Sequence, residues 1–276
     1  MIWARILRET GGAATTRTLR LAGVTDRALR AAVEQGSVVR PRRGVYALPS
    51  LLPSGMDALR HGGRLSCVSA ARSYGLWGGT DARTHLAFPQ HAGRSGPATV
   101  RHWGRLDAHD ELWWVSLADC LRSVVRCADR ETAVAVLDTA LSSGKVVPAQ
   151  LRRLFEGEPA ASRRVAADAR PGSESGVESI LRQRLTARGH LVEQQIAVPG
   201  VGRIDMRVDG VLHIEVDGFA FHSDPAAFER DRLRDSALEL RGLRRLRFAA
   251  RQVLEDADRV VAFVEEVLPV VEEIRR

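Results

Sequence analysis

Two short segments with alternating polar and apolar residues, 203–208 and 211–217, most restrict what this chain can fold into. In both segments the odd positions are polar and the even positions are apolar, which is the pattern of half-buried β-strands. A hairpin of these strands would place Asp205, Glu215 and Asp217 on one face of a sheet, above an apolar layer. Three carboxylates on one face predict a divalent metal site and hydrolytic chemistry on phosphates.

The turn between the two strands decides which residues face each other. A two-residue loop would pair the polar residues of one strand with the apolar residues of the other. The alternation excludes this pairing, because a register shift of one residue moves every side chain of a strand to the opposite face. We therefore predict a three-residue loop that ends at Gly210, built from a type I turn followed by a left-handed glycine. This loop would pair Arg207 with Val211 and Asp205 with His213.

Length and composition limit the class of protein. The chain has 276 residues, enough for two or three domains, and its 45% hydrophobic content is typical of a globular protein. No apolar run reaches the roughly 18 residues of a membrane span, and the N-terminus has no signal-peptide core, so we expect a cytoplasmic protein without membrane contacts. The three cysteines, Cys67, Cys120 and Cys127, form no CxxC pair, which indicates a reducing compartment and argues against zinc.

Positive charge is concentrated at the N-terminal end. Residues 1–50 carry a net charge of +6 and residues 173–276 carry −3, in a chain with a total of +7. The basic end is a candidate surface for nucleic acid, although genomic composition bias can also produce many arginines.

Residues 1–50 predict a winged helix-turn-helix. Helices are expected over 2–10, 15–22 and 26–35, the last one capped by Thr25, and two short strands are expected within 37–48. In the third helix Leu29 and Val33 should face inward, because they are four residues apart. The same helix should expose Asp26, Arg27, Arg30 and Glu34.

The arginines of this region predict contacts with double-stranded DNA. Arg27 and Arg30 would enter the major groove, whereas Arg40, Arg42 and Arg43 would contact phosphates. The alternative is a small helical domain with a solvated basic surface.

Residues 51–156 predict a small α+β middle domain, and residues 157–172 predict a linker with room for one helical turn. The middle domain should contain helices near 65–75, 116–127 and 130–141, the second of them capped by Ser116, and strands near 84–88 and 98–106. We expect its core to hold Trp77, Trp103, Trp113 and Trp114. Its histidines have no metal-ligand spacing, so we interpret them as incidental: His85, His91, His102 and His109.

Residues 173–276 predict a third domain with the element order αβββαβα, so the chain as a whole is α/β, or α+β overall. The expected helices are 175–188, 225–241 and 256–274, and the expected strands lie near 191–198, 203–208, 211–217 and 243–248.

Two further residues are candidates near the carboxylates. Glu178 lies one turn into its helix, where Ser175-x-x-Glu178 is equally well explained as a capping box that binds the Ser175 amide. His222 could be a general acid or base, a phosphate contact, or a surface-loop histidine.

The three carboxylates also have an alternative explanation, a solvated sheet face neutralised by Arg203 and Arg207. Glu215 and Asp217 nevertheless repel each other on one face unless a cation lies nearby, which favours a metal site. Because carboxylate oxygens are hard ligands, we expect Mg²⁺ or Mn²⁺ at this site.

An ordered set of motifs runs through residues 173–270: Ser175-x-x-Glu178, Gln195, Ile204-Asp205, Ile214-Glu-Val-Asp-Gly218, His222, Asp231, Arg234-Asp235 and Leu246-Arg-Phe248. This set resembles a bacterial domain related to the very-short-patch-repair endonucleases, within the PD-(D/E)XK nuclease superfamily. The resemblance implies Asp205 and Glu215 as metal ligands, with Glu178 as a candidate third ligand. The superfamily places a lysine where this chain has Asp217, so either Asp217 joins the metal shell or activity is impaired.

The N-terminal half carries a second set of motifs: Gly23-Val-Thr25, the stretch 43–47 (Arg-Gly-Val-Tyr-Ala) and the stretch 69–76 (Ser-Ala-Ala-Arg-Ser-Tyr-Gly-Leu). Over residues 1–155 these motifs resemble the AbiEi family of type IV toxin–antitoxin antitoxins. That resemblance implies a winged helix that represses its own operon, with a cognate toxin or self-association as the partner.

Together these observations predict a DNA-binding, Mg²⁺-dependent endonuclease that acts in phage defence or DNA repair. Asp205 and Glu215 would hold the metal, and Asp217, His222 or Glu178 would orient the attacking water. The rival hypothesis is an antitoxin-like transcriptional repressor whose nuclease fold is inactive.

Overall fold

The computed structural model describes residues 1–89, 99–104, 106–218, 232, 236, 238 and 240–275. The chain divides into two compact units, one made of residues 1–129 and 153–163, the other of residues 130–152 and 164–276. Helices α8 (Pro148–Phe155) and α9 (Ala160–Asp168) each contain residues of both units. Within the described residues, no helix combines the length and the apolar character needed to cross a membrane.

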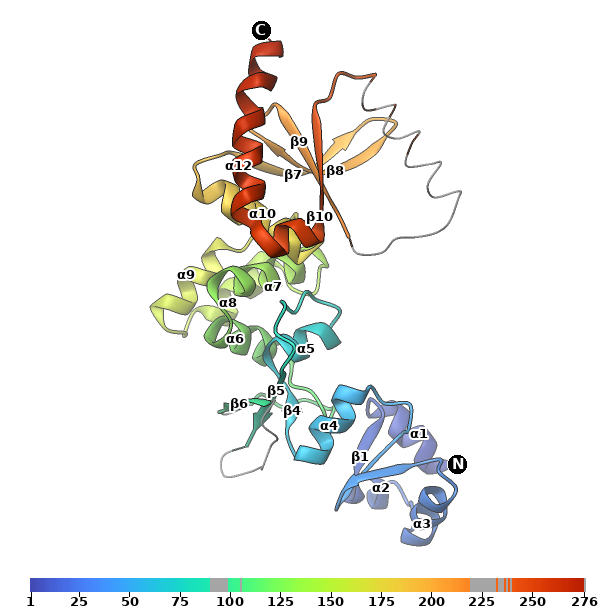
Figure 1. Ribbon diagram of the computed structural model, residues 1–276. Coiled ribbons are helices and arrows are strands. Elements are labelled where there is room, and N and C mark those ends of the chain that lie inside the picture. The colour runs from blue at the N-terminus through green and yellow to red at the C-terminus, as the bar shows by residue number, and fades with distance from the viewer. Residues whose placement is uncertain are drawn as a thin grey trace. The chain divides into compact units, whose positions relative to one another are not determined.

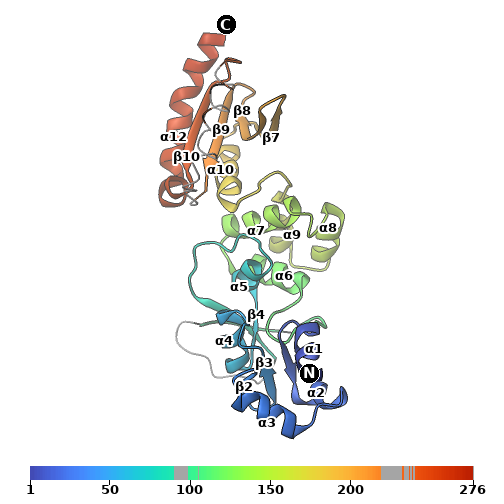
Figure 2. The same cartoon turned by 90° about the vertical axis from the view of Figure 1, so that its right-hand side faces the viewer.

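The first unit begins with three helices and a small antiparallel sheet (Figures 1 and 2). The elements are α1 (Ile2–Glu9), β1 (Ala13–Thr15), α2 (Thr16–Leu21), α3 (Asp26–Glu34), β2 (Val39–Arg42) and β3 (Val45–Ala47), with sheet order β1-β3-β2. As predicted, Thr25 caps α3, because its hydroxyl accepts a hydrogen bond from the Ala28 amide at 3.2 Å. The short strand β1 had no counterpart in the sequence prediction.

The inner face of α3 differs from the prediction at one position. Leu29 and Ala32 are buried in the core with Leu7 and Leu19, whereas Val33 is 36% exposed. The inward stripe therefore follows the i, i+3 spacing from Leu29, and the prediction that Val33 faces inward is wrong.

The rest of the first unit is built around a second sheet. Its elements are α4 (Pro53–His61), β4 (Arg64–Leu65), α5 (Cys67–Ser73), β5 (Thr84–Phe88), β6 (Thr99–Trp103) and α6 (Leu117–Cys127), with sheet order β4-β5-β6. Strands β5 and β6 are parallel. Ser116 caps α6 as predicted, because its hydroxyl accepts a hydrogen bond from the Asp119 amide at 3.1 Å.

The tryptophans predicted for the middle core behave differently from one another. Trp113 is buried and stacks on Trp114, which in turn stacks on Tyr74. Trp103 ends the edge strand β6 and is 60% exposed, so its assignment to the core is wrong.

The second unit contains α7 (Arg130–Ser142), α10 (Gly176–Ala187), β7 (Val192–Val198), β8 (Gly202–Val208), β9 (Leu212–Asp217), β10 (Arg245–Ala249) and α12 (Ala250–Arg275). The sheet order is β10-β9-β8-β7, with β10 parallel to β9 and the other pairs antiparallel. The helix predicted over 225–241 falls almost wholly outside the described residues. The last helix starts at Ala250 rather than at 256, and non-helical backbone at Asp256 (φ −155°) divides it.

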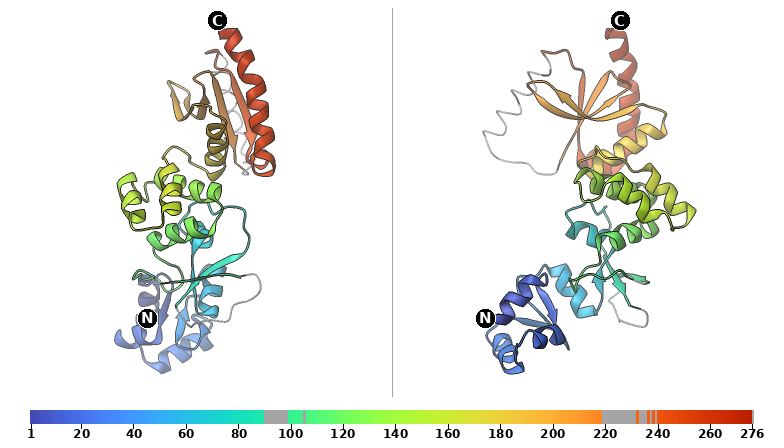
Figure 3. Two further views of the ribbon diagram at one scale, coloured as in Figure 1. Left: turned by 90° about the vertical axis from the view of Figure 1, so that its left-hand side faces the viewer. Right: turned by 180° about the vertical axis from the view of Figure 1, so that it is seen from behind.

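Helix α12 covers the apolar face of this sheet (Figures 1 and 3). It packs against β9, β10 and α10, while α10 also contacts β7. Phe248, on the even-numbered face, meets Phe263 of α12 edge-on, with 6.2 Å between ring centroids. On the same face Ile204, Met206 and Ile214 are almost completely buried. The alternation in the sequence thus predicted the apolar face correctly.

A buried ion pair joins α7 to α10. Arg182 donates to Asp138 at 2.7 Å, and their side chains are 2% and 0% exposed. The Ser179 hydroxyl donates to the same carboxylate at 2.7 Å, and the Arg170 amide donates to its other oxygen at 2.8 Å. These hydrogen bonds compensate for the loss of hydration of a buried charge.

The segment predicted as a linker, residues 157–172, contains the nine-residue helix α9. Its end is attached to α7, because the Gly172 amide donates to the Ser142 hydroxyl at 2.9 Å, in addition to the Arg170 contact with Asp138.

The hairpin between β8 and β9 has a different register from the prediction. The loop covers Asp209–Val211, since Val208 pairs with Leu212 and Arg207 pairs with His213. Asp209 has a positive φ of 51° in addition to Gly210 at 72°, and the Asp209 carboxylate accepts hydrogen bonds from His190 and Leu191, which lie between α10 and β7. The predicted pairs Arg207–Val211 and Asp205–His213 are therefore wrong by two residues, but the shift is even and each side chain keeps its predicted face.

Candidate active site

The odd-numbered face of the C-terminal sheet brings Asp205 and Glu215 together. Because Met206 pairs with Ile214, the same register sets Asp205 opposite Glu215 across the hairpin. On the other side of Glu215, the paired residue of the parallel strand β10 is Arg247. The predicted grouping of Asp205 and Glu215 on one face is thus confirmed by the strand register.

The sheet opens at the row that contains Asp205. Strand β8 pairs with β9 only as far as Met206, and beyond that point it pairs with β7 alone. The Asp205 carboxylate reaches across this opening and accepts a hydrogen bond from the Val216 amide at 2.7 Å. In β7 the residue opposite Asp205 is Gln195, whose φ of 53° is unusual for a residue other than glycine. Both neighbouring strands therefore depart from regular pairing beside this carboxylate.

Arginines of β10 bind the other two carboxylates. Glu215 is buried, and its Oε2 accepts a hydrogen bond from Arg245 at 2.9 Å. Asp217 is half exposed and forms a two-point contact with Arg247, at 2.7 and 3.1 Å. The row of negative charge predicted from the sequence is thus neutralised by a second row of positive charge from the neighbouring strand.

Glu178 lies in the first turn of α10, where one of the two hydrogen bonds of the predicted capping box is present and the other is replaced. The Ser175 hydroxyl accepts a hydrogen bond from the Glu178 amide at 3.2 Å, as a capping box requires. The Glu178 carboxylate, however, accepts a hydrogen bond from the Glu174 amide at 2.9 Å, and not from the Ser175 amide as predicted. Burial raises the pKa of Glu178 to about 7; the Ser175 hydrogen bond opposes this rise, and the negative charge of Asp205 adds to it.

The predicted set of carboxylates does not form a compact cage. Within the described residues, the ligand atoms of three or more His, Cys, Asp or Glu side chains converge at one place only, and that group consists of Cys67, His85, His102 and Cys127. The interpretation of His85 and His102 as incidental is therefore wrong. His222, the remaining predicted catalytic residue, lies outside the described residues, as does His91.

The arginines predicted to bind DNA are all exposed: Arg27, Arg30, Arg40, Arg42 and Arg43. Of the two acidic residues of α3, Asp26 pairs with Arg20 at 2.6 Å, which leaves Arg27 and Arg30 against Glu34 alone. The Arg40 guanidinium lies 5.8 Å from the centre of the Tyr46 ring, a cation–π contact between β2 and β3.

Comparison with known proteins gives two family matches. Residues 178–268 match the family model REase_MTES_1575, a restriction endonuclease-like domain. Residues 4–49 match AbiEi_4, described as a transcriptional regulator, AbiEi antitoxin. No match was found among curated proteins. The AbiEi resemblance is confirmed over residues 4–49, and the nuclease resemblance is confirmed as a restriction endonuclease-like domain over residues 178–268. The matches indicate nuclease chemistry in general for the C-terminal region and a DNA-binding regulator for the N-terminal region.

Proposed function

We propose that the protein binds double-stranded DNA through a winged helix at its N-terminus and cleaves phosphodiester bonds with its C-terminal domain. The observation that carries this proposal is the position of Asp205 and Glu215. They share one sheet face at the row where β8 leaves β9, inside the region that matches a restriction endonuclease-like family. In this proposal Arg27 and Arg30 read the major groove, and Arg40, Arg42 and Arg43 contact phosphates.

The residues around Asp205 fit a hard divalent cation such as Mg²⁺ or Mn²⁺. Their donors are carboxylate oxygens, and the negative charge of Asp205 already disfavours the ionised form of Glu178. Glu215 would have to share its oxygen with Arg245, or release it, for the cation to bind. When bound, such a cation polarises the scissile phosphate and lowers the pKa of a coordinated water.

The side chains of this chain have distinct tasks in the proposed reaction. The Val216 amide holds Asp205 in one orientation, so the carboxylate is positioned before substrate arrives. Glu178, with a pKa of about 7, can accept or release a proton near neutral pH. Asp217 and Arg247 lie at the strand end, where Arg247 supplies a positive charge in a domain that contains no lysine.

A second function, transcriptional repression without cleavage, is favoured by one observation. Arg245 and Arg247 already neutralise Glu215 and Asp217, which is the arrangement expected of a domain that no longer needs a metal. In that case the C-terminal domain would serve binding or self-association, with a cognate toxin as a further candidate partner.

The experiment that separates the two functions is a cleavage assay. The protein is incubated with supercoiled plasmid and with duplex oligonucleotides in Mg²⁺, Mn²⁺ or EDTA, and compared with Asp205→Asn and with Glu193→Gln. Glu193 is the matched control because it pairs with Arg207 on the same sheet, at 2.7 Å. We expect metal-dependent cleavage that Asp205→Asn abolishes and Glu193→Gln retains. Cleavage that survives Asp205→Asn contradicts the site, and sequence-specific binding without cleavage supports the repressor.

A further inference from the structure

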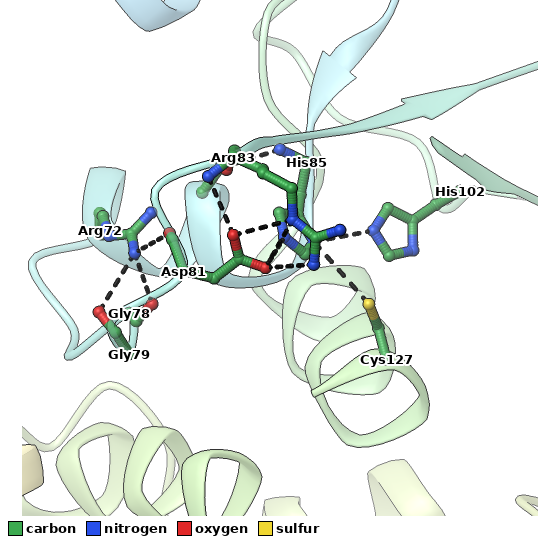
Figure 4. Close-up of polar contacts among 9 residues, drawn as sticks. Arg72, Gly78, Gly79, Asp81, Arg83, His85, His102 and Cys127 are labelled. Atoms are coloured by element: carbon green, nitrogen blue, oxygen red, sulfur yellow. Dashed lines mark hydrogen bonds and ion pairs between the residues drawn. The ribbon is translucent and has the colours of Figure 1, made fainter. Parts of the chain in front are cut away.

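Four metal-binding side chains meet in the first unit, and this cluster does not depend on the proposed nuclease function. Cys67 is the first residue of α5, His85 lies in β5, His102 lies in β6, and Cys127 is the last residue of α6. Each offers one ligand atom, and the four atoms all lie within 4.8 Å of one another. Figure 4 shows His85, His102 and Cys127 pointing toward a common centre.

Two separations within the cluster match those of ligands around one ion. His85 Nδ1 lies 3.2 Å from His102 Nε2 and 3.8 Å from Cys127 Sγ. Metal–ligand bonds of roughly 2.0–2.1 Å for nitrogen and 2.3 Å for sulfur place tetrahedral ligands about 3.3–3.8 Å apart. The backbone at Cys67 supports a built site, because its φ of 49° is costly for a non-glycine residue and requires support from the surrounding structure.

We propose that Cys67, His85, His102 and Cys127 bind one Zn²⁺ ion in a tetrahedral site. Two thiolates and two imidazoles are the ligand set of structural zinc, whereas Mg²⁺ and Ca²⁺ prefer oxygen. All four positions are filled by protein, so the ion has no open position for a substrate and its role is structural. The bound ion would link helices α5 and α6 to strands β5 and β6.

A second layer of contacts orients His85 for this role. Asp81 lies 3.3 Å from His85 Nε2, so its carboxylate accepts the Nε2 proton and leaves Nδ1 unprotonated and directed at the cluster (Figure 4). Arg83 holds the Asp81 carboxylate in turn, at 2.7 Å. A carboxylate behind a ligating histidine is a recurrent feature of zinc sites.

The test is the metal content of the full-length chain, purified without an affinity tag from cells grown with added zinc. We expect about one zinc per chain by plasma mass spectrometry. Cys127→Ser and His102→Ala should each reduce the zinc content at least about tenfold, because three ligands hold structural zinc poorly. The matched control is Cys120→Ser, a buried cysteine whose thiol donates to the Cys67 carbonyl and takes no part in the cluster. Cys120→Ser and Asp205→Asn should both retain the zinc.

A spectroscopic measurement tests the site without depending on how much of each variant the cells produce. Replacement of the ion by Co²⁺ should give the thiolate charge-transfer and strong visible bands of a tetrahedral site, which Cys127→Ser should lose while its circular dichroism stays native. The proposal is overturned if folded protein binds no stoichiometric Zn²⁺ or Co²⁺. It is equally overturned if Cys127→Ser retains the metal, or if mass spectrometry of the unreduced chain finds a Cys67–Cys127 disulfide.

Discussion

The Cys–His cluster of the first unit and the carboxylate face of the second assemble in opposite ways. The cluster takes its four side chains from two helices and two strands spread over residues 67–127, yet their ligand atoms converge within 4.8 Å. The carboxylates come from a single hairpin, yet each has its own partner: the Val216 amide for Asp205, Arg245 for Glu215 and Arg247 for Asp217.

The difference follows from charge. Thiols and imidazoles can be neutral, so four of them can lie in contact before a metal binds, and burial favours the neutral forms of Cys67, His85 and His102. Carboxylates at the same separation would repel one another, so the fold supplies arginines or keeps the acids apart. A preformed cage is therefore easier to recognise in a structure for zinc than for magnesium.

The largest expected effect concerns Glu215. We predict that Glu215→Gln lowers metal-dependent cleavage by about 10²–10³-fold, because it removes a charged ligand from the reacting region. The measurement is single-turnover cleavage of a duplex oligonucleotide at saturating protein, with Glu193→Gln as the control. Equal rates for Glu215→Gln and the wild type would mean that the Arg245–Glu215 pair is only structural.

The next effect is a pH dependence of stability that Glu178 produces. Its folded pKa of about 7 exceeds its ordinary value of 4.5, so the protonated form stabilises the fold. Between pH 4.5 and 7 the wild type should lose stability relative to Glu178→Gln, by up to about 3 kcal/mol, with no further change at higher pH. Urea denaturation at several pH values measures this difference.

The effect of divalent metal on this stability difference separates a metal-binding role of Glu178 from a capping role. If Glu178 is a metal ligand, saturating Mg²⁺ or Mn²⁺ should stabilise its ionised form and shrink the difference from Glu178→Gln at pH 7. A difference that metal leaves unchanged would assign Glu178 to capping alone.

A smaller effect should follow from the removal of an arginine. We predict that Arg245→Met strengthens Mn²⁺ binding about tenfold, because a positive charge 2.9 Å from a Glu215 oxygen competes with the cation. Calorimetric titration measures the affinity, and Arg207→Met, which breaks the equivalent pair with Glu193, is the control. Weaker binding by Arg245→Met would instead show that Arg245 orients Glu215 for the metal.

The smallest effect separates DNA binding from both metal regions. Arg43→Gln should reduce the slope of log K against log salt by about one and leave sequence preference unchanged, as expected for a phosphate contact. Arg5→Gln, which changes an exposed arginine of α1, is the control. Fluorescence anisotropy at several salt concentrations tests this, and an unchanged slope for Arg43→Gln would remove the wing from the DNA interface.

The sequence predicted what depends on local periodicity and failed where distant segments decide. Alternation alone assigned Asp205 and Glu215 to one face, and the caps Thr25 and Ser116 were correct because a cap needs only its own helix. The hairpin register was wrong because hydrogen bonds from His190 and Leu191, in the connection between α10 and β7, hold the Asp209 carboxylate.

The cluster could not be predicted from spacing for the same reason. Cys67 and Cys127 meet only because α5 packs on α6, and the two histidines meet only because β5 and β6 are neighbours. One local signal was available: Asp81 lies four residues before His85 in a segment with Arg83, a carboxylate within reach of an imidazole.

The buried pair of Asp138 and Arg182 sets the point at which the nuclease-like region can be excised. A fragment that starts at residue 173 would lack α7, leaving the Arg182 guanidinium without its counter-ion, at a cost of about 3–5 kcal/mol. A fragment that starts at residue 130 retains both partners and the Ser142 contact. Truncation and domain-exchange experiments should therefore treat α7 as part of the region that follows it.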